Sequence, residues 1–306
     1  MSIPRRQFLR YAGWAGPTAF FSLATAARSQ SSPIAEVPFK LPLKANSTRF
    51  AIIGDSGTGE TPQYQIAAEM QRLHAEFPFE FVLMLGDNIY GDNSASSFRR
   101  RFEDPYQPLL KSGIKFYAAL GNHDDPSQRL YKPFNMDGKR FYSLRKGDAD
   151  FFALDSTYMN PEQLTWVQKE LSGSSAKWKI CFFHHPLYSN ARFHGPDVDL
   201  RKQLEPLLNQ NGVNVVLNGH EHVYERLQPQ RGVQYFVLGS SGQLRHGDLR
   251  PSRDTAKGFD RDRAFALMEV SGEELFFQVI SARRETVDSG VLTKMKSAAA
   301  VSGQGN

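Results

Sequence analysis

Short apolar runs that end abruptly in glycine or polar residues recur along this chain and determine its predicted fold. The clearest is Phe81–Leu85, which is followed directly by Gly86 and Asp87. A run of this length and ending is typical of a buried strand that stops at its carboxyl end. The runs of this kind are residues 49–53, 81–85, 115–120, 179–183 and 213–218. Each of them predicts a strand whose carboxyl end carries a polar loop.

Amphipathic segments separate several of these strands. In residues 64–73, apolar side chains recur at spacings that give one apolar helix face. Further helices are predicted at 95–110, 161–171 and 199–208, and further strands at 140–144, 149–154, 234–238, 264–270 and 274–280. Alternation of strand and helix is typical of βαβ units, so we expect a single α/β domain.

The first 30 residues have the pattern of a targeting segment. They contain Arg5-Arg6-Gln7-Phe8-Leu9, a weakly apolar stretch and the small residues Ala24-Thr25-Ala26. This pattern resembles a twin-arginine export signal, and its apolar part is shorter than the roughly 20 residues that span a bilayer. We therefore expect an exported protein, periplasmic or extracellular, with no stable membrane anchor once the signal is removed.

The rest of the chain divides into three parts. Residues 31–46 are rich in Ser and Pro and are predicted to be a linker, and residues 47–285 form the expected folded domain. From Thr286 the periodicity is lost, so residues 286–306 are predicted to be a disordered tail.

Charge and cysteine content narrow the possible functions. The formal net charge is +5, and removal of a signal that ends at Ala26 would take away Arg5, Arg6 and Arg10 and leave +2. So weak a positive charge gives no indication of binding to a nucleic-acid scaffold. The single cysteine, Cys181, lies in an apolar run, which excludes an intramolecular disulfide and favours an inert core residue.

Side chains of metal-ligand type follow all five of the abruptly ending strands. They are Asp55, Asp87 with Tyr90, Asn122 with His123, His184 with His185, and His220 with His222. Because the ends of neighbouring strands of one sheet lie close together, we expect these side chains to converge. Such oxygen and nitrogen donors suit iron, zinc or manganese, and they suffice for two ions that share one carboxylate. Paired ions are a common device for hydrolysing phosphate esters.

The motifs at these strand ends resemble a known family. In chain order they are Gly54-Asp55, Gly86-Asp87-Asn88-Ile89-Tyr90, Gly121-Asn122-His123-Asp124, His184-His185-Pro186 and Gly219-His220-Glu221-His222. This series resembles the calcineurin-like metallophosphoesterases, and Tyr90 points within them to purple acid phosphatases of the small, single-domain, tartrate-resistant type. The resemblance implies an α/β fold, a four-layer α/β/β/α sandwich of two mixed sheets flanked by helices.

The resemblance also implies two ligand sets. The positions that match iron(III) ligands are Asp55, Asp87, Tyr90 and His222. The positions that match ligands of a second ion, which is iron(II), zinc or manganese, are Asp87, Asn122, His184 and His220. Asp87 would thus bridge the two ions. The alternative for Tyr90 is a packing residue with a solvated hydroxyl.

Other positions match residues that act on the phosphate. The resemblance implies that His123 contacts it, and Asn122 and His185 are predicted to contact it as well. It further implies that His123 assists the leaving group and that His194 protonates it. From the residues alone, His185 either lines the pocket or caps a turn, and a loop histidine such as His194 is more often merely solvated. The implied reaction is hydrolysis of a phosphate monoester by a hydroxide that forms on the metal pair and attacks phosphorus in line.

Two other functions stay open at this point. A phosphodiesterase or nucleotidase would use the same metal pair, because the motifs bind the phosphoryl group and not the esterified alcohol. A non-catalytic exported phosphate-binding protein would be expected to lack a ligand, and none of the seven is missing. The expected partner is a small phosphate-ester substrate, and the sequence does not indicate an oligomeric state.

Overall fold

The five abruptly ending apolar runs all form strands, as predicted, but they belong to two sheets. We describe residues 40–294 of a computed structural model of the chain. The strands of the first sheet are β1 (Thr48–Ile53), β2 (Phe81–Met84) and β3 (Lys115–Ala118), and those of the second are β6 (Trp178–Phe183) and β7 (Val215–Asn218). The loops that were expected along one sheet edge therefore come from two edges.

Both sheets are mixed. The first has the order β13-β12-β11-β1-β2-β3. Strands β1–β3 are parallel, and β11 (Ala264–Ser271), β12 (Glu274–Ser281) and β13 (Thr286–Thr293) each pair antiparallel with the strand before them in the sheet, starting from β1. The second has the order β10-β8-β9-β7-β6-β5-β4. Its further strands are β4 (Tyr142–Lys146), β5 (Ala149–Ala153), β8 (Tyr224–Leu227), β9 (Gln234–Leu238) and β10 (Thr255–Phe259).

Aromatic side chains join the two sheets face to face. Phe50 of β1 meets Phe151 of β5 edge to face, with ring centroids 5.1 Å apart. At another point of the same layer, Phe236 of β9 packs on Phe277 of β12 at 5.2 Å. Such contacts between sheets exclude water from the space between them. The main core of the described residues therefore lies between the sheets.

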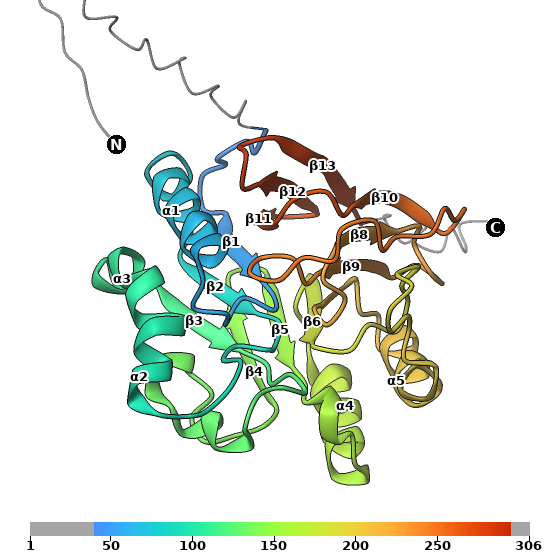
Figure 1. Ribbon diagram of the computed structural model, residues 1–306. Helices are drawn as coiled ribbons and strands as arrows, with labels where there is room; N and C mark the ends of the chain where they lie inside the picture. Colours follow the sequence, from blue (N-terminus) through green and yellow to red (C-terminus); the bar gives the residue numbers. More distant parts are fainter. Residues whose placement is uncertain (1–39, 295–306) are drawn as a thin grey trace, which may run out of the picture. The chain divides into compact units, whose positions relative to one another are not determined.

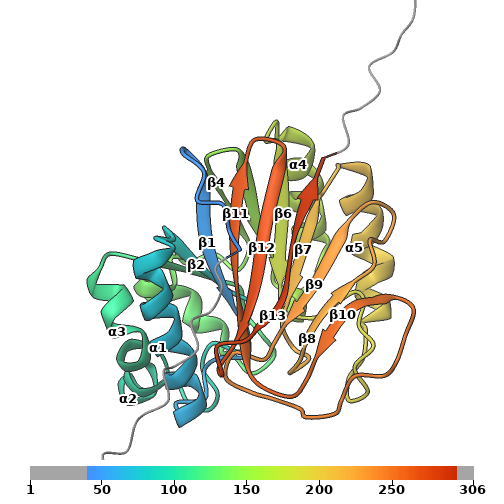
Figure 2. The same cartoon turned by 90° about the horizontal axis from the view of Figure 1, so that it is seen from above.

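Helices cover the outer face of each sheet (Figures 1 and 2). On the first sheet lie α1 (Thr61–Glu76), α2 (Ala95–Phe98) and α3 (Asp104–Lys111), with the π-helical turn η1 (Arg99–Glu103) between the last two. On the second lie α4 (Pro161–Gly173) and α5 (Val198–Gln210). Short 3₁₀ turns are η2 (Pro126–Leu130), η3 (Lys132–Phe134) and η4 (Ser156–Tyr158). The predicted α/β sandwich of two mixed sheets with flanking helices is confirmed.

The predicted apolar helix faces are the buried ones. In α1, Ile66, Met70 and Leu73 are fully buried. Helix α4 begins with Pro161, where a missing N–H costs nothing, and Asn160 caps it by accepting the Gln163 N–H. A second apolar cluster forms between the second sheet and its helices, and it includes Cys181. The thiol is completely buried, in agreement with a core role.

The prediction that the chain is disordered from Thr286 is wrong for residues 286–293, which form β13. This strand lies at the edge of its sheet and pairs with β12, and polar residues and a glycine occupy five of its eight positions, so the apolar pattern is weak. Asp288 of β13 accepts hydrogen bonds from Tyr224 Oη and Arg226 Nε of β8, both at 2.7 Å. These bonds tie the strand to the opposite sheet.

The end of the predicted linker is also part of the fold. Leu41 is buried, and the backbone N–H groups of Leu43 and Lys44 donate to the carboxylate of Glu269 on β11. The predicted signal, residues 1–30, lies outside the described residues, as do the remainder of the linker and residues 295–306. Within residues 40–294, the helices are all too short or too polar to cross a bilayer.

Shortening a core side chain tests the packing of the first sheet. Leu83 of β2 is fully buried, so Leu83→Ala should lower the free energy of unfolding by about 2–5 kcal/mol in urea titrations. Leu130, which is 64% exposed, provides the matched control, and Leu130→Ala should change it by less than about 0.5 kcal/mol. Equal effects of the two substitutions would contradict this assignment of the core.

Candidate metal centre

Loops from both sheets meet at one place and are joined by backbone hydrogen bonds. Asp55 N–H donates to Gly86 O at 3.1 Å, which joins the loops after β1 and β2. Gly219 N–H donates to His184 O at 3.0 Å, which joins the loops after β6 and β7. Ser241 N–H, after β9, donates to Gly54 O at 3.2 Å and links the two sheets. The strand-end residues are therefore spatial neighbours.

Three of these residues have a left-handed backbone. The φ angles are 52° at Asp55, 52° at Asp87 and 70° at His220, a region that non-glycine residues rarely adopt. Each such residue costs about 1–3 kcal/mol and persists only where the surroundings enforce it. The surroundings of Asp87 are closely packed, because a Cβ on the neighbouring Gly121 would lie only 2.2 Å from Asp87 Oδ1.

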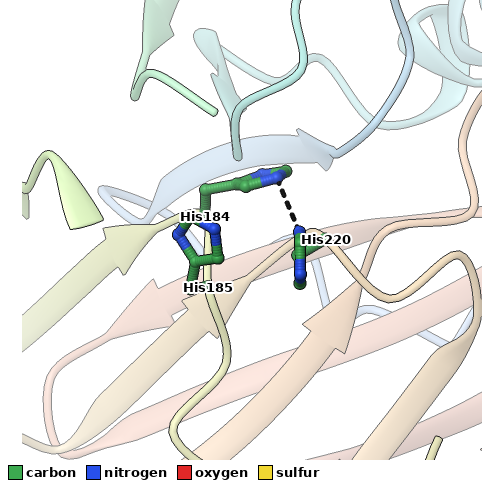
Figure 3. A group of neighbouring side chains, drawn as sticks. All are labelled: His184, His185 and His220. Carbon is green, nitrogen blue, oxygen red and sulfur yellow. Dashed lines mark hydrogen bonds between the residues drawn. The ribbon is translucent and has the colours of Figure 1, made fainter. Parts of the chain in front are cut away.

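One group of donors consists of two imidazoles and an amide. His184 Nε2, His220 Nδ1 and Asn122 Oδ1 form a triangle with edges of 2.9, 3.0 and 3.1 Å. Figure 3 shows the contact between the nitrogens of His184 and His220, whose rings are steeply inclined to each other. His184 Nδ1 donates to Leu85 O at 3.0 Å, so its Nε2 presents a lone pair. Two ligands about 2.1 Å from a shared ion, at right angles, lie about 3 Å apart, which is the spacing seen here.

A second group combines a carboxylate, a phenol and an imidazole. Tyr90 Oη lies 3.4 Å from Asp55 Oδ1 and 3.3 Å from His222 Nε2. The third edge, from Asp55 Oδ1 to His222 Nε2, is 3.4 Å. These three atoms therefore form another triangle of potential ligands, composed of the residues predicted for the first ion.

Asp87 lies between the two groups. Its Oδ1 is 3.4 Å from His184 Nε2 in one group. Its carboxylate also lies within 4.8 Å of ligand atoms of Asp55 and His222 in the other. The side chain is almost fully buried, and Oδ1 accepts the His123 N–H at 3.0 Å. Asp87 thus has the place that a bridging ligand needs.

Burial keeps the imidazoles in the form that binds metal. It lowers the pKa of His184 and His220, with neighbouring histidines adding to the effect, and it lowers the pKa of His222 to about 4. Burial also raises the pKa of Asp55, helped by the nearby carboxylate of Asp87. Neutral imidazoles and crowded carboxylates are both stabilised by cations. The donor set therefore fits two metal ions.

The three other predicted histidines surround this centre. The His123 ring is exposed and lies 5.1 Å from that of Tyr90. The His185 ring lies 4.4 Å from that of His220, and its Nδ1 shares a hydrogen bond with Ser156 Oγ at 2.9 Å. The exposed His194 ring lies 4.2 Å from His220 on the outer side. The structure thus brings together all the predicted site residues, and their individual roles stay predictions.

Asp124 supports the site although the sequence did not indicate this. Its buried carboxylate accepts the N–H groups of Gly121, Asn88 and Ile89, and so joins the loops after β2 and β3. Burial raises the pKa of Asp124 to about 7, with Asp87 adding to the effect. Asp124 is the last residue of the motif Gly121-Asn122-His123-Asp124, but only the structure shows that its carboxylate binds backbone N–H groups of the neighbouring loops.

Arg245 is a second residue that sequence reasoning missed. Its Nη2 donates to His194 Nε2 at 3.2 Å, and its backbone N–H donates to His222 O at 2.9 Å. It follows β9, another strand that ends in glycine and polar residues at this edge, and this pattern could have indicated it. Gln243 N–H donates to Asp55 O at 3.1 Å, so the backbone of residues 243–245, which follows β9, is bonded to the site.

Comparison with known proteins assigns the family. Residues 48–224, which contain all five strand-end motifs, match the family described as calcineurin-like phosphoesterase. The chain belongs to this family. It is accordingly a metal-dependent phosphoesterase, and the donors described above are its candidate metal ligands.

Relatives with similar chains are acid phosphatases. Identity is 27% with tartrate-resistant acid phosphatase type 5 of Mus musculus, over 79% of this chain and 91% of that one. It is also 27% with purple acid phosphatase 17 of Arabidopsis thaliana, over 67% and 71%. The fold is similar to that of a purple acid phosphatase from yellow lupin seeds, with a TM-score of 0.69, 19% identity, and coverage of 82% of this chain and 54% of that one. The predicted resemblance is confirmed.

Removing the central carboxylate should empty the centre. We expect Asp87→Ala to lower the metal content of the purified protein from about two ions per chain to fewer than one, because both groups lose a shared ligand. Elemental analysis measures this. Asp199→Ala, which removes an exposed carboxylate at the start of α5, is the control and should keep the full content. An Asp87→Ala protein with full metal content would refute the bridging position.

Proposed function

We propose that this phosphoesterase hydrolyses small phosphate monoesters. The observation that carries the proposal is the juxtaposition of Tyr90 with Asp55 and His222, beside a second group that Asp87 connects to it. This is the arrangement expected of a purple acid phosphatase, and relatives with that name match two thirds or more of the chain. A phosphomonoesterase is thus favoured over a phosphodiesterase or nucleotidase, which shares the family but has no observation of its own here.

We propose iron(III) for the group with Tyr90. Burial raises the pKa of Tyr90 well above its usual value, and the carboxylates of Asp55 and Asp87 raise it further. A phenolate therefore forms here only beside a strong Lewis acid, and iron(III) is such an ion. For the group of Asn122, His184 and His220, with nitrogen and amide donors, we propose iron(II), zinc or manganese.

The surrounding residues position the phosphate. When bound, the metal pair supplies Lewis acidity toward water and toward the phosphoryl oxygens. We propose that the side chains of Asn122, His123 and His185 donate hydrogen bonds to the substrate phosphate. The exposed His123 ring lies beside Tyr90, and this position supports the proposal that it stabilises charge building up on the phosphoryl group.

We propose that His194 assists the leaving group. A guanidinium only donates, so the Arg245 contact requires His194 Nε2 to accept and leaves the ring proton on Nδ1. Partial burial lowers the pKa of His194, and the charge of Arg245 lowers it further. This arrangement favours a hydrogen bond from neutral Nδ1–H to the leaving oxygen over transfer of a whole proton.

We further propose that the enzyme works outside the cytoplasm, in the periplasm or extracellular space. The twin-arginine pattern at Arg5 and Arg6 supports export in the folded state. A protein that leaves the cytoplasm already folded can bind its metal ions there before export.

A substrate panel with metal removal tests the proposed activity. The loaded enzyme should hydrolyse 4-nitrophenyl phosphate, and a chelator should lower kcat/KM by more than about 100-fold, because charge on phosphorus is no longer neutralised. Adding iron with zinc should restore the rate. The control substrate is bis(4-nitrophenyl) phosphate, a diester with the same leaving group. A higher kcat/KM for the diester, or activity that survives the chelator, would refute a metal-dependent phosphomonoesterase.

The proposed tyrosinate has an optical signature. The iron-loaded enzyme should absorb visible light by charge transfer from Tyr90, and Tyr90→Phe should remove this band while the iron content is largely kept. Tyr158→Phe is the control, because Tyr158 is an exposed tyrosine on η4. A visible band that survives Tyr90→Phe would assign the colour to another ligand.

A further inference from the structure

The guanidinium of Arg245 contacts three side chains, which are those of His194, Phe193 and Glu221. It donates to His194 Nε2 at 3.2 Å, lies 3.9 Å from the centre of the Phe193 ring, and is 3.8 Å from Glu221 Oε2. Its side chain is 23% exposed. Arg245 therefore lies between the outer edge of the site and the protein interior.

Glu221 is the interior partner. It stands between His220 and His222 in the sequence, is completely buried, and has its Oε1 accepting the Gly195 N–H. Its Oε2 has no hydrogen-bond partner among the described residues, so the charge of Arg245 is its main compensation. A buried acid with one unpaired oxygen is costly, and this cost favours retention of the nearby cation.

The backbone that precedes His194 is held by bonds that do not involve the side chain of Arg245. Buried Glu225 on β8 accepts hydrogen bonds from Ser189 Oγ and from Asn190 N–H. Arg192 N–H donates to Asp248 O at 3.0 Å, and Arg250 N–H donates to Asn190 O at the same distance. These bonds fix the backbone. Among the described residues, the His194 ring contacts Phe193, His220 and Arg245. These three contacts determine its orientation.

We propose that Arg245 is a positioning residue that fixes the ring orientation and tautomer of His194 at the leaving-group side of the metal centre. The inference deepens the proposed function, on which it rests. Most neutral histidines carry the ring proton on Nε2, but a donor at Nε2 forces the proton to Nδ1. Without Arg245 the ring can rotate and change tautomer, and the donor no longer points to one place.

A spectroscopic test separates this role from a purely structural one. In zinc-loaded protein with ¹⁵N-labelled histidine, side-chain NMR should show His194 with its proton on Nδ1, the signals being assigned by comparison with His194→Ala. Arg245→Ala should shift His194 to the Nε2–H form or to a mixture. Arg253→Ala, which removes an exposed arginine from the same segment, should leave the tautomer unchanged. An unchanged tautomer in Arg245→Ala would overturn the proposal.

Leaving-group dependence provides the kinetic test. Arg245→Ala should lower kcat/KM for an alkyl ester such as glycerol phosphate about 10-fold or more, because an alkoxide leaves poorly without a hydrogen-bond donor. For 4-nitrophenyl phosphate the loss should stay below about threefold. In a His194→Ala background, Arg245→Ala should add no further loss, since the residue acts through His194. Metal content is measured in every variant and should equal that of the wild type.

Other outcomes have distinct meanings. Equal losses for both esters, or losses that multiply in the double variant, would overturn the positioning role. Arg245→Lys keeps the charge but not the planar fork, so a full rescue by lysine would show that charge alone acts and would also overturn it. If the wild type hydrolyses neither ester, the proposed function fails, and the NMR result still decides whether Arg245 positions His194.

Discussion

Electron-pair donors held at about 3 Å from one another are the constraint on which this structure depends. His184 Nε2, His220 Nδ1 and Asn122 Oδ1 offer lone pairs to the same point, and a buried carboxylate, Asp87, lies beside them. Such a group repels itself unless cations occupy its centre. The left-handed backbone at Asp87 and the glycine at position 121 are the local cost of bringing these atoms together.

The two sheets supply different ligand chemistry. The strand ends of the first sheet carry the oxygen donors, which are Asp55, Asp87, Tyr90 and Asn122. The strand ends of the second carry the imidazoles of His184, His220 and His222. Each group of candidate ligands therefore draws on both sheets, and the aromatic contacts between the sheets, such as Phe50 with Phe151, also determine how the groups are aligned. Packing of the core and metal binding are thermodynamically linked.

The sequence predicted those parts that repeat a strong local signal. Five apolar strands that end in glycine or polar residues indicated the candidate ligands, because burial and strand ends leave a clear pattern. The edge strand β13 was missed because polar residues dominate it, and Asp288 becomes meaningful only when β8 reaches it from the other sheet. Arg245 was missed for a related reason. Its contact with His194 joins residues 51 positions apart in the chain. Such a contact forms only in the folded protein and leaves no local sequence pattern.

The central claim is that two metal ions bind where the strand ends of the two sheets meet, and that they share Asp87. Anomalous X-ray diffraction from crystals of the metal-loaded enzyme, recorded at the iron and zinc absorption edges, tests it most directly. The account predicts two separate anomalous peaks, one contacted by Asp55, Tyr90 and His222 and the other by Asn122, His184 and His220, with Asp87 touching both. A single peak, or two peaks of which one lies away from Asp87, would contradict it.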